Sequence, residues 1–335
     1  MTATTASPSI PGLPDAGGVR ITVAVPTFRR PADLADLLPR LLEQAAEVTA
    51  GGRYCAEVLV VDNDPTGSAA AVVAGLPGVR YVTEARPGIA AVRDRALDEA
   101  ADSRLLAFID DDERPRDGWL AALVGTWEDS SAAAVSGRVL AEYTAPVDPW
   151  IEAGRFFVRR QLPTGTAIDV AATGNLLLDL DQVRAAGTRF QSSLGLAGGE
   201  DTLFSRSLAR AGGRMVWCDE SAVYDRVPAE RMTRRWVLTR AWSHGNATVL
   251  TELRLAPGGA ARLRVRALGL GRGVLRVGGG AARWALGLAV RSPRHQARGA
   301  RALFRGAGMV GGAVGVVYEE YARTGRRWRL GRVAA

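Results

Sequence analysis

The chain of 335 residues contains no lysine, only two histidines and only two cysteines, Cys55 and Cys218. Because the cysteines are isolated, the sequence excludes a disulfide framework and a cysteine–histidine zinc cluster, which fits a reducing cytoplasm. No stretch reaches the roughly 18 uninterrupted apolar residues that a membrane-spanning helix needs. Residues 1–18 are rich in Thr, Ser, Pro and Gly and lack the apolar core of a signal peptide. We therefore expect residues 1–18 to be a disordered lead-in.

The net charge of +8 is distributed very unevenly along the chain. Residues 226–335 contain 22 arginines against four acids, a balance of +18, whereas residues 1–225 have a balance of −10. We therefore expect an acidic globular unit over residues 19–228, followed by a basic region over residues 229–335. Such a basic segment indicates an anionic partner, either nucleic acid or the inner membrane leaflet.

Four consecutive acids follow an apolar run at residues 105–109 that is typical of a buried parallel strand. These acids are Asp110, Asp111, Asp112 and Glu113. Crowded carboxylates repel one another, so we expect a compensating cation. Mg²⁺ and Mn²⁺ favour oxygen ligands and usually keep substrate phosphates in their coordination shell. The alternative is a solvated acidic turn that begins the next helix.

Strand and helix patterns alternate regularly in the first third of the chain. Apolar runs predict strands at residues 21–25, 57–61, 79–83 and 105–109. Periodic leucines or alanines predict helices between them, at residues 34–42, 68–76 and 88–101. This alternation predicts a parallel sheet with helices on both faces, and ligands beyond the carboxyl ends of its strands. We expect a less regular second half. Its predicted helices are at residues 118–129 and 199–211, its strands at residues 132–143, 176–178 and 215–224, and a loop at residues 146–165.

Seven short motifs occur in order along residues 20–250. They are Val25-Pro26-Thr27-Phe28, Val60-Val61-Asp62-Asn63-Asp64, Arg86-Pro87-Gly88-Ile89, Phe108-Ile109-Asp110-Asp111-Asp112-Glu113, Thr173-Gly174-Asn175, Gly198-Gly199-Glu200-Asp201 and Arg234-Arg235-Trp236. Together they resemble the family 2 inverting glycosyltransferases, which have a GT-A fold. Within that family, the Arg-Pro-Gly-Ile, Thr-Gly-Asn and Gly-Gly-Glu-Asp sequences look most like those of the succinoglycan-biosynthesis type of bacterial polysaccharide enzymes.

The resemblance implies a Rossmann-like, mostly parallel sheet and a role for each motif. It implies nucleotide binding by Pro26, Thr27, Asp62, Arg93, Asp110 and Asp111, and a Mg²⁺ or Mn²⁺ ion held by Asp112 and Asp110. It places the sugar or acceptor pocket at Gly174, Asn175, Gly199 and Glu200, and a lid over the diphosphate at Arg234, Arg235 and Trp236. The chain departs from the family at Asp94, where the family usually has Asn. Surface pairing of Arg93, a turn before a core strand for Asn175, and simple core packing for Trp236 are the alternatives.

Sugar transfer also needs a base that deprotonates the acceptor hydroxyl as it attacks. The resemblance assigns this role to Asp201, which lies at a predicted helix N-terminus. The helix dipole there favours the carboxylate form but weakens it as a base. Ordinary helix capping is the alternative. The two preceding glycines, Gly198 and Gly199, favour the functional interpretation because they let a substrate approach the backbone closely.

The basic third combines arginines with Leu, Val, Ala and Gly, which is typical of interfacial helices on anionic lipid. Arg294, Arg298, Arg301 and Arg305 are spaced for one helical face. Glycines at residues 269, 271, 273 and 278–280 are expected to weaken any long continuous helix. The alternative is a helical cap whose arginines pair with the acidic domain. Nucleic-acid binding is disfavoured because no reader motif accompanies the charge.

The sequence thus predicts a metal-dependent inverting glycosyltransferase that uses a nucleotide-sugar, UDP-linked in most relatives. The expected acceptor is a glycan or lipid-linked glycan in polysaccharide or cell-envelope synthesis, with the enzyme peripheral on the inner face of the membrane. Two alternatives stay open: a glycosyltransferase of specialised metabolism with a small-molecule acceptor, and a non-catalytic sugar-nucleotide-binding scaffold.

Overall fold

The computed structural model describes residues 18–191, 198–319 and 328–330, and within these ranges its main sheet has nine strands. The predicted lead-in, apart from Gly18, lies outside the described residues. One half of the sheet is parallel, in the order β3-β2-β1-β4, and consists of Val79–Thr83, Tyr54–Asp62, Val19–Thr27 and Leu105–Ile109. The sheet continues from β4 in the order β8-β6-β9-β5 with Asn175–Asp179, Ala134–Tyr143, Met215–Val227 and Glu113–Pro115. Strand β7 (Ala167–Ile168) pairs with β9.

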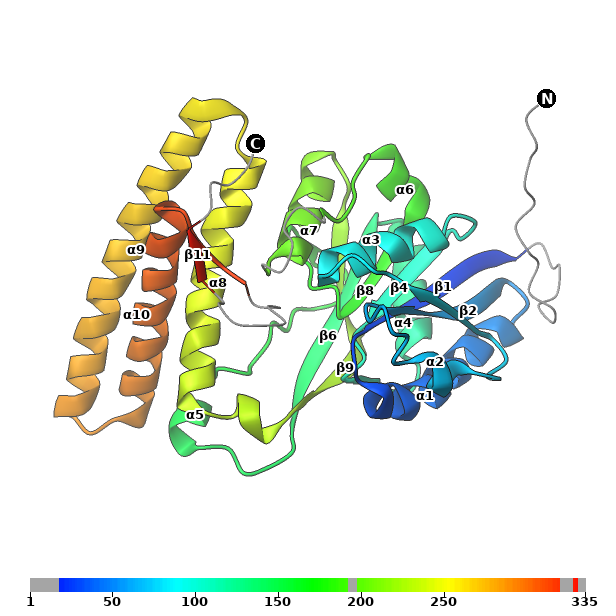
Figure 1. Ribbon diagram of the computed structural model, residues 1–335, viewed down its shortest axis with the longest axis horizontal. Coiled ribbons are helices and arrows are strands. Elements are labelled where there is room, and N and C mark those ends of the chain that lie inside the picture. Colours follow the sequence, from blue (N-terminus) through cyan, green and yellow to red (C-terminus); the bar gives the residue numbers. More distant parts are fainter. Residues whose placement is uncertain (1–17, 192–197, 320–327, 331–335) are drawn as a thin grey trace.

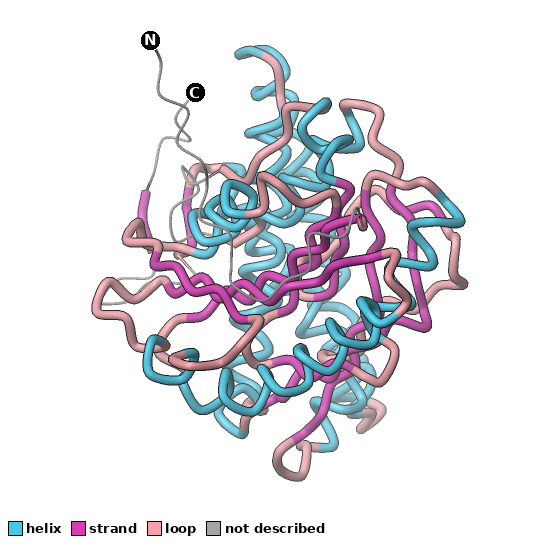
Figure 2. The backbone as a smooth tube through the Cα atoms, turned by 90° about the vertical axis from the view of Figure 1, so that its right-hand side faces the viewer, coloured by secondary structure: helices cyan, strands magenta, loops and turns pink. Residues whose placement is uncertain are grey.

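Helices cover both faces of this sheet, as Figures 1 and 2 show. On one face, α1 (Pro31–Ala50) and α4 (Trp119–Ser130) pack leucines against alternate side chains of β1, β2 and β4. The opposite face is covered by α3 (Ile89–Glu99), α6 (Leu180–Ala185) and α7 (Glu200–Arg210). The short helix α2 (Ala70–Val73) follows β2. Since both faces are buried, the central strands are mostly apolar. The expected α/β fold with a sheet flanked by helices is confirmed, although β8, β5 and β7 pair antiparallel with their neighbours.

The parallel register brings the carboxyl ends of β1, β2 and β4 to one edge of the sheet. Thr27, the last residue of β1, pairs with Asp62, the last residue of β2. Strand β4 runs beside β1 and ends at Ile109, directly before the four acids. The edge that the sequence analysis identified as the ligand-binding edge is therefore built by three neighbouring strands.

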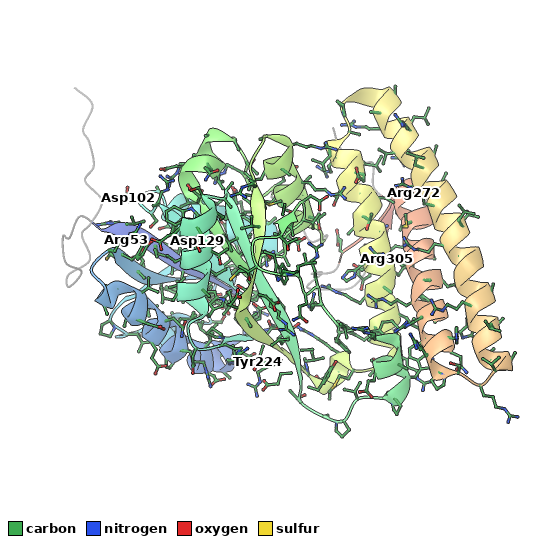
Figure 3. The ribbon with its side chains drawn as sticks, turned by 180° about the vertical axis from the view of Figure 1, so that it is seen from behind. Arg53, Asp102, Asp129, Tyr224, Arg272 and Arg305 are labelled. Atoms are coloured by element: carbon green, nitrogen blue, oxygen red, sulfur yellow. The ribbon has the colours of Figure 1, made fainter. Side chains whose placement is uncertain are left out.

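Three helices follow the sheet and form the other end of the molecule (Figure 1). A short 3-10 turn at Ala229–Arg231 leads into α8 (Arg234–Leu255), and α9 (Gly258–Ala289) and α10 (Pro293–Ala313) form a hairpin whose α10 lies against α8. Figure 3 shows Arg272 and Arg305 on these helices, with Asp102 and Asp129 at the far end of the sheet. Strands β10 (Val316–Tyr318) and β11 (Trp328–Leu330) pair antiparallel. No helix within the described residues combines the length and hydropathy that crossing a bilayer requires.

Two sequence-based expectations were wrong. The presumed loop at residues 146–165 contains α5 (Pro149–Gly154), whose first turn is capped by the Asp148 carboxylate. More importantly, α9 is a continuous helix of 32 residues despite its glycines. The buried residues of α9 are glycines, and a Cβ atom at Gly280 would lie 2.5 Å from the backbone nitrogen of Leu303 in α10. Close backbone packing therefore compensates the low helix propensity of glycine.

Candidate functional site

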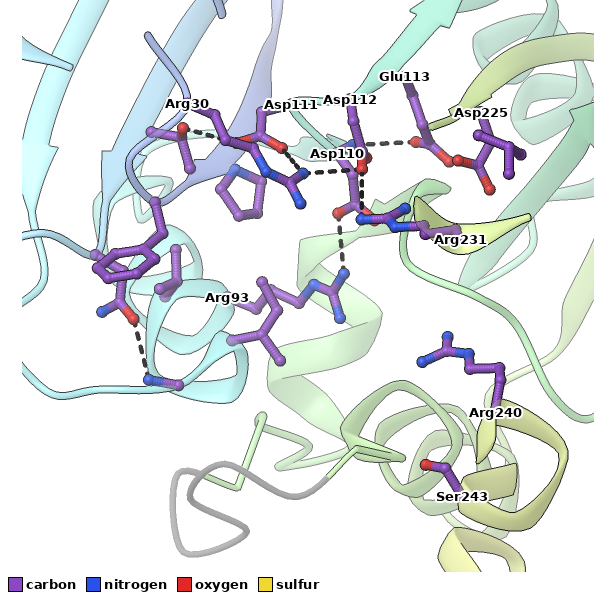
Figure 4. A pocket seen from close by; sticks show the side chains of 18 of the residues that line it. Arg30, Arg93, Asp110, Asp111, Asp112, Glu113, Asp225, Arg231, Arg240 and Ser243 are labelled. Atoms are coloured by element: carbon purple, nitrogen blue, oxygen red, sulfur yellow. Dashed lines mark hydrogen bonds and ion pairs between the residues drawn. The ribbon is translucent and has the colours of Figure 1, made fainter. Parts of the chain in front are cut away.

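A cavity of about 600 Å³ lies between the carboxyl ends of β1 and β4 and the first turns of α8. Its sheet-side wall includes Pro26, Thr27, Arg30, Asn63, Arg93, Asp110, Asp111, Asp112 and Glu113. Asp225 of β9 lies beside Glu113, and the opposite wall includes Phe157, Arg159, Arg231, Trp236, Arg240 and Ser243. Figure 4 shows the acids gathered at one side and Arg240 and Ser243 of α8 facing them across the space. The sheet edge predicted from sequence is thus one wall of a sizeable cavity.

Asp111 and Asp112 are held by cations of the protein. The Thr27 hydroxyl donates a hydrogen bond of 2.8 Å to Asp111, and the Arg30 guanidinium lies 2.8 Å from both carboxylates. Arg231, from the opposite wall, lies 3.2 Å from Asp112. Burial raises the pKa of Asp111 to about 6, with the nearby Asp112 acting in the same direction and Arg30 opposing. Asp111 is buried and fixes the wall, whereas Asp112 joins the two walls of the cavity.

Three further carboxyl groups crowd the floor of the cavity. Strand pairing places Glu113 opposite Asp225, and Glu113 also accepts a hydrogen bond of 3.1 Å from the Asp110 backbone N–H. Burial, together with the carboxylates of Asp110 and Asp225, raises the pKa of Glu113 well above its usual range. Desolvation also raises the pKa of Asp110, while Arg93 opposes this effect. Asp110 and Asp225 form ion pairs of 3.0 Å with Arg93 and Arg159, whereas Glu113 forms none among the described residues.

This donor chemistry fits a divalent cation that is shared with a phosphorylated ligand. Among the described residues, no group of three or more His, Cys, Asp or Glu side chains is arranged to hold a metal by itself. Mg²⁺, however, is commonly held by one or two carboxylates, with substrate phosphates and water completing the shell. Asp110 and Asp112 both line the cavity and supply hard oxygen donors. The residues present therefore fit a metal that binds together with a diphosphate.

Arg93 connects the acidic strand end to α7. Its guanidinium forms ion pairs with Asp110, at 3.0 Å, and with the buried Glu200 at the start of α7. Burial raises the pKa of Glu200 to about 7, against the opposing effect of Arg93. Asp201, the next residue, is partly exposed and accepts a hydrogen bond of 2.6 Å from the Thr202 backbone N–H. Asp201 does not line the cavity, although Arg93 and Asp110 tie its helix to the cavity wall.

Gly199 precedes this helix in a left-handed conformation, with φ of 99°. A Cβ atom there would lie 3.2 Å from Ala247 of α8, so the glycine permits both the turn and the close approach of the two helices. The predicted pocket role of Gly199 stays a prediction, because Gly199 is not among the residues that line the cavity.

Two predicted ligand-binding residues have structural contacts instead. Asp62 is fully buried and accepts hydrogen bonds from the backbone N–H groups of Asp64 and Ala69 and from the Tyr81 hydroxyl. These bonds hold the loop after β2, and the adjacent Asn63 lines the cavity in its place. The predicted nucleotide-binding role of Asp62 stays a prediction, and in this structure its carboxylate is bonded within the protein.

Asn175 likewise lies beneath the cavity rather than in it. Its amide accepts a bond of 2.9 Å from the Trp119 indole and donates to the carbonyls of Arg138 and Ser221. These contacts join α4, β6 and β9, as the turn-before-a-strand alternative implies. Gly174 supports the site indirectly, because a Cβ atom there would lie 2.6 Å from the Glu113 carboxylate.

The predicted lid residues separate in the structure. Trp236 lines the cavity and stacks on Phe157 with ring centroids 5.9 Å apart. Arg234 instead forms an ion pair with Asp148 and lies over the Trp150 ring, and Arg235 is exposed. The arginines that reach the cavity from this region are Arg231 and Arg240.

Sequence reasoning missed several cavity residues. Arg30, Asp225 and Arg240 belong to no motif of the ordered set, whereas Arg231 lies three residues before Arg234 and belongs with the Arg-Trp element. Arg30 follows the first strand closely, and this position was a usable signal. Asp225 reaches the site only because β9 pairs with β5. Its place depends on contacts between residues about one hundred positions apart.

Comparison with known proteins gives two kinds of similarity. A family model described as "Glycosyl transferase family 2" matches residues 22–180. The "Succinoglycan biosynthesis protein ExoM" of Rhizobium meliloti (strain 1021) is 34% identical over 232 residues, which are 68% of this chain and 73% of ExoM.

Similarity to solved structures is found at much lower sequence identity, and the chain shares its fold with GalNAc-T7. GalNAc-T7, solved with UDP, GalNAc and Mn²⁺, has a TM-score of 0.50 and 11% identity over 70% of this chain and 51% of that chain. TarS of S. aureus has a TM-score of 0.48 and 14% identity over 73% of this chain and 42% of that chain. The chain therefore matches about half or less of the length of these two proteins.

Proposed function

The chain belongs to glycosyl transferase family 2, and from this premise we propose that it transfers a sugar from a UDP-sugar to a hydroxyl group of a lipid-linked glycan, with inversion at the anomeric carbon. Residues 19–228 act as the catalytic domain and residues 229–335 as a basic helical region in this proposal. The similarity to a succinoglycan biosynthesis protein supports a polysaccharide acceptor. The fold shared with GalNAc-T7, a structure that contains UDP and Mn²⁺, is consistent with the donor and the metal.

One observation carries the proposal: acids and arginines face each other across a single cavity at the carboxyl edge of the sheet. A nucleoside diphosphate has two phosphates that need cationic partners and a nucleoside that needs a pocket wall. Arg231 supplies positive charge from the 3-10 turn before α8 and Arg240 from α8 itself, while Pro26, Thr27 and Asn63 supply the wall beside β1. Arginine suits this role because its planar guanidinium can bind two phosphate oxygens at once.

Asp110 and Asp112 would hold the divalent cation, which supplies Lewis-acid neutralisation of the diphosphate as it leaves. The protein's own residues perform the remaining work. Arg30 and Thr27 fix Asp111, and this fixes the backbone of the acidic turn between Asp110 and Asp112. Arg231 contacts Asp112 and reaches the same region from the opposite wall, where it can bind the diphosphate.

Asp201 is the proposed base that accepts the proton of the attacking hydroxyl. It lies in the first turn of α7, where the helix dipole interacts favourably with negative charge. The chain of ion pairs from Glu200 through Arg93 to Asp110 orients this helix relative to the strand end. A single displacement in which the acceptor attacks opposite the leaving diphosphate inverts the anomeric carbon. Binding both reactants in one cavity supplies the required alignment.

The helices α9 and α10 support a location at the inner face of the membrane. Residues 258–313 contain no Asp or Glu. Leu275 is 76% exposed and Trp284 is 42% exposed, in a helix whose buried residues are glycines. Exposed apolar side chains interleaved with arginines are typical of surfaces that lie on anionic lipid.

The test is release of nucleoside diphosphate by the purified protein from UDP-, dTDP- and GDP-sugars, with Mn²⁺ or with EDTA. We expect slow hydrolysis of a UDP-sugar that is lost with EDTA and in Asp201→Asn. Asp102→Asn is the matched control, because this exposed carboxylate lies at the opposite end of β4. Asp201→Asn should still bind UDP by calorimetry. Wild-type turnover by Asp201→Asn would remove Asp201 as the base, and preference for another nucleotide would refute the UDP assignment.

A further inference from the structure

A second cavity, of about 350 Å³, lies where α5 meets the α9–α10 hairpin. We call it the arginine pocket, because it is lined by Arg155, Arg283, Arg298 and Arg301 together with Gly154 and Val158. No acid is among its lining residues. In the described part of the chain, none of these four arginines forms an ion pair. The catalytic cavity differs, because Arg30, Arg93 and Arg231 there all contact carboxylates.

The arginines are held together despite their like charges. Arg301 donates a hydrogen bond of 3.0 Å to the Arg155 carbonyl and lies over the Phe156 ring. Desolvation and the neighbouring guanidinium groups lower the pKa of Arg298. Arg155 also has a φ of 54°, a conformation that favours glycine, yet the chain places an arginine there. A cluster of this kind disfavours the folded state until an anion enters it, and guanidinium groups match phosphate especially well.

The surroundings of the pocket indicate what carries the anion. Arg283 is followed on α9 by Trp284, Leu286 and Leu288, which are 42%, 51% and 48% exposed. Their helix packs on α10 through glycines, so its large apolar side chains stay outside. A soluble anion such as free phosphate would make no contact with this apolar surface. A lipid has both parts: a phosphate for the arginines and an interface for the apolar side chains.

We propose that the arginine pocket binds the headgroup phosphate of an anionic membrane phospholipid and thereby orients the enzyme on the membrane surface. This inference rests on the proposed function at the inner leaflet. The segment that lines the pocket also lines the catalytic cavity: Arg155 and Val158 face the pocket, whereas Phe157 and Arg159 line the cavity. A phospholipid bound in the pocket therefore places the opening of the cavity close to the headgroups, where a lipid-linked acceptor presents its sugar.

Charge-preserving variants separate this pocket from general attraction of a basic surface. The pocket variant is Arg283→Lys with Arg298→Lys, and the matched control is Arg264→Lys with Arg272→Lys, two exposed arginines of α9 that do not line the pocket. The assay is cosedimentation with phosphatidylcholine vesicles that contain or lack phosphatidylglycerol. We expect the pocket variant to lose about tenfold in affinity for the anionic vesicles, because lysine cannot make the two-pronged phosphate contact. The control should bind as the wild type does.

Three results would overturn the proposal. Equal vesicle affinity of both variants and the wild type would mean that net charge alone drives binding. Equal binding to vesicles without phosphatidylglycerol would exclude an anionic headgroup. Inorganic phosphate that binds the wild type by calorimetry and displaces it from vesicles would identify a site for a soluble anion. Nucleotide release should be the same in both variants as in the wild type. A wild type that binds vesicles as expected but releases no nucleotide would refute the proposed function without contradicting the proposed phospholipid site.

Discussion

Adjacent glycines of α9 should respond in opposite directions to the same substitution. At Gly279 an added Cβ atom meets nothing within 4 Å, so Gly279→Ala should stabilise the protein by up to about 1 kcal/mol through helix propensity. At Gly280 the Cβ atom would lie 2.5 Å from the Leu303 nitrogen and 2.9 Å from the Gly299 carbonyl oxygen. Both are backbone atoms that cannot rotate away. Gly280→Ala should therefore destabilise the protein by about 1–3 kcal/mol, the usual cost of overpacking.

The measurement is urea unfolding followed by far-ultraviolet circular dichroism, with both variants prepared in parallel. The result is decided by the sign of each variant's change in free energy of unfolding relative to the wild type. Comparing the two variants cancels the change in helix propensity and in the unfolded state that they share. If both substitutions stabilise the protein, α9 does not pack on α10 through its glycines. The argument that its large apolar side chains face outward would then lose its basis.

Three further outcomes test the site. Asp112→Asn should weaken Mn²⁺-dependent binding of UDP by at least about tenfold in calorimetry, and unchanged affinity would refute the metal assignment. Asp62→Ala should lower the free energy of unfolding by about 2–3 kcal/mol, because it leaves buried donors such as the Tyr81 hydroxyl unpaired; wild-type stability would contradict its structural role. The pKa of Glu200 is raised to about 7 in the folded state, so the folded protein binds this proton more tightly than the unfolded chain does. As pH rises from 4.5 to 7, the free energy of unfolding of the wild type should therefore fall by up to about 3 kcal/mol relative to that of Glu200→Gln. Parallel pH profiles of the two proteins would refute this.

The parallel half of the sheet could be predicted from sequence because its signals are local. The strands at Val58–Val61 and Leu105–Ile109 are buried on both faces, so each appears as an unbroken apolar run that ends in acids. The leucines of α1, from Leu34 to Leu41, have the spacing of one buried helix face. Such patterns need no knowledge of the remaining chain.

The site was only partly predictable, since half of it comes from distant segments. Asp110 and Asp112 stand at a strand end and were identified by position alone. Asp225 joins them through strand pairing and has no local signature. Asp62 shows a limit of the pattern, because a carboxylate at a strand end looks the same in sequence whether it faces a ligand or holds its own loop.

The glycine content of α9 led to the wrong expectation that no long continuous helix would form. Low helix propensity counts against glycine in an isolated helix. In a hairpin the same residue lets two backbones approach, and the packing gained depends on the partner helix. Gly280 lies against Gly299, and Gly273 against Gly306, although the two members of each pair are separated by 19 and 33 positions in the chain. Propensity alone contains no information about this partner.

The charge asymmetry of the chain divides into two parts once the helices are placed. Arginines near the start of α8 pair with the acidic domain, as Arg231 does with Asp112 and Arg234 with Asp148. For them, the contacts are those expected of a cap on the acidic domain. The arginines of α9 and α10 make no such ion pair in the part of the chain that the structure describes. Some of them donate hydrogen bonds to backbone carbonyls, as Arg301 does to Arg155, but among the described residues no carboxylate neutralises their charge. This charge is therefore available for an external anion. The difference between α8 and the α9–α10 hairpin favours a membrane surface over a purely internal role.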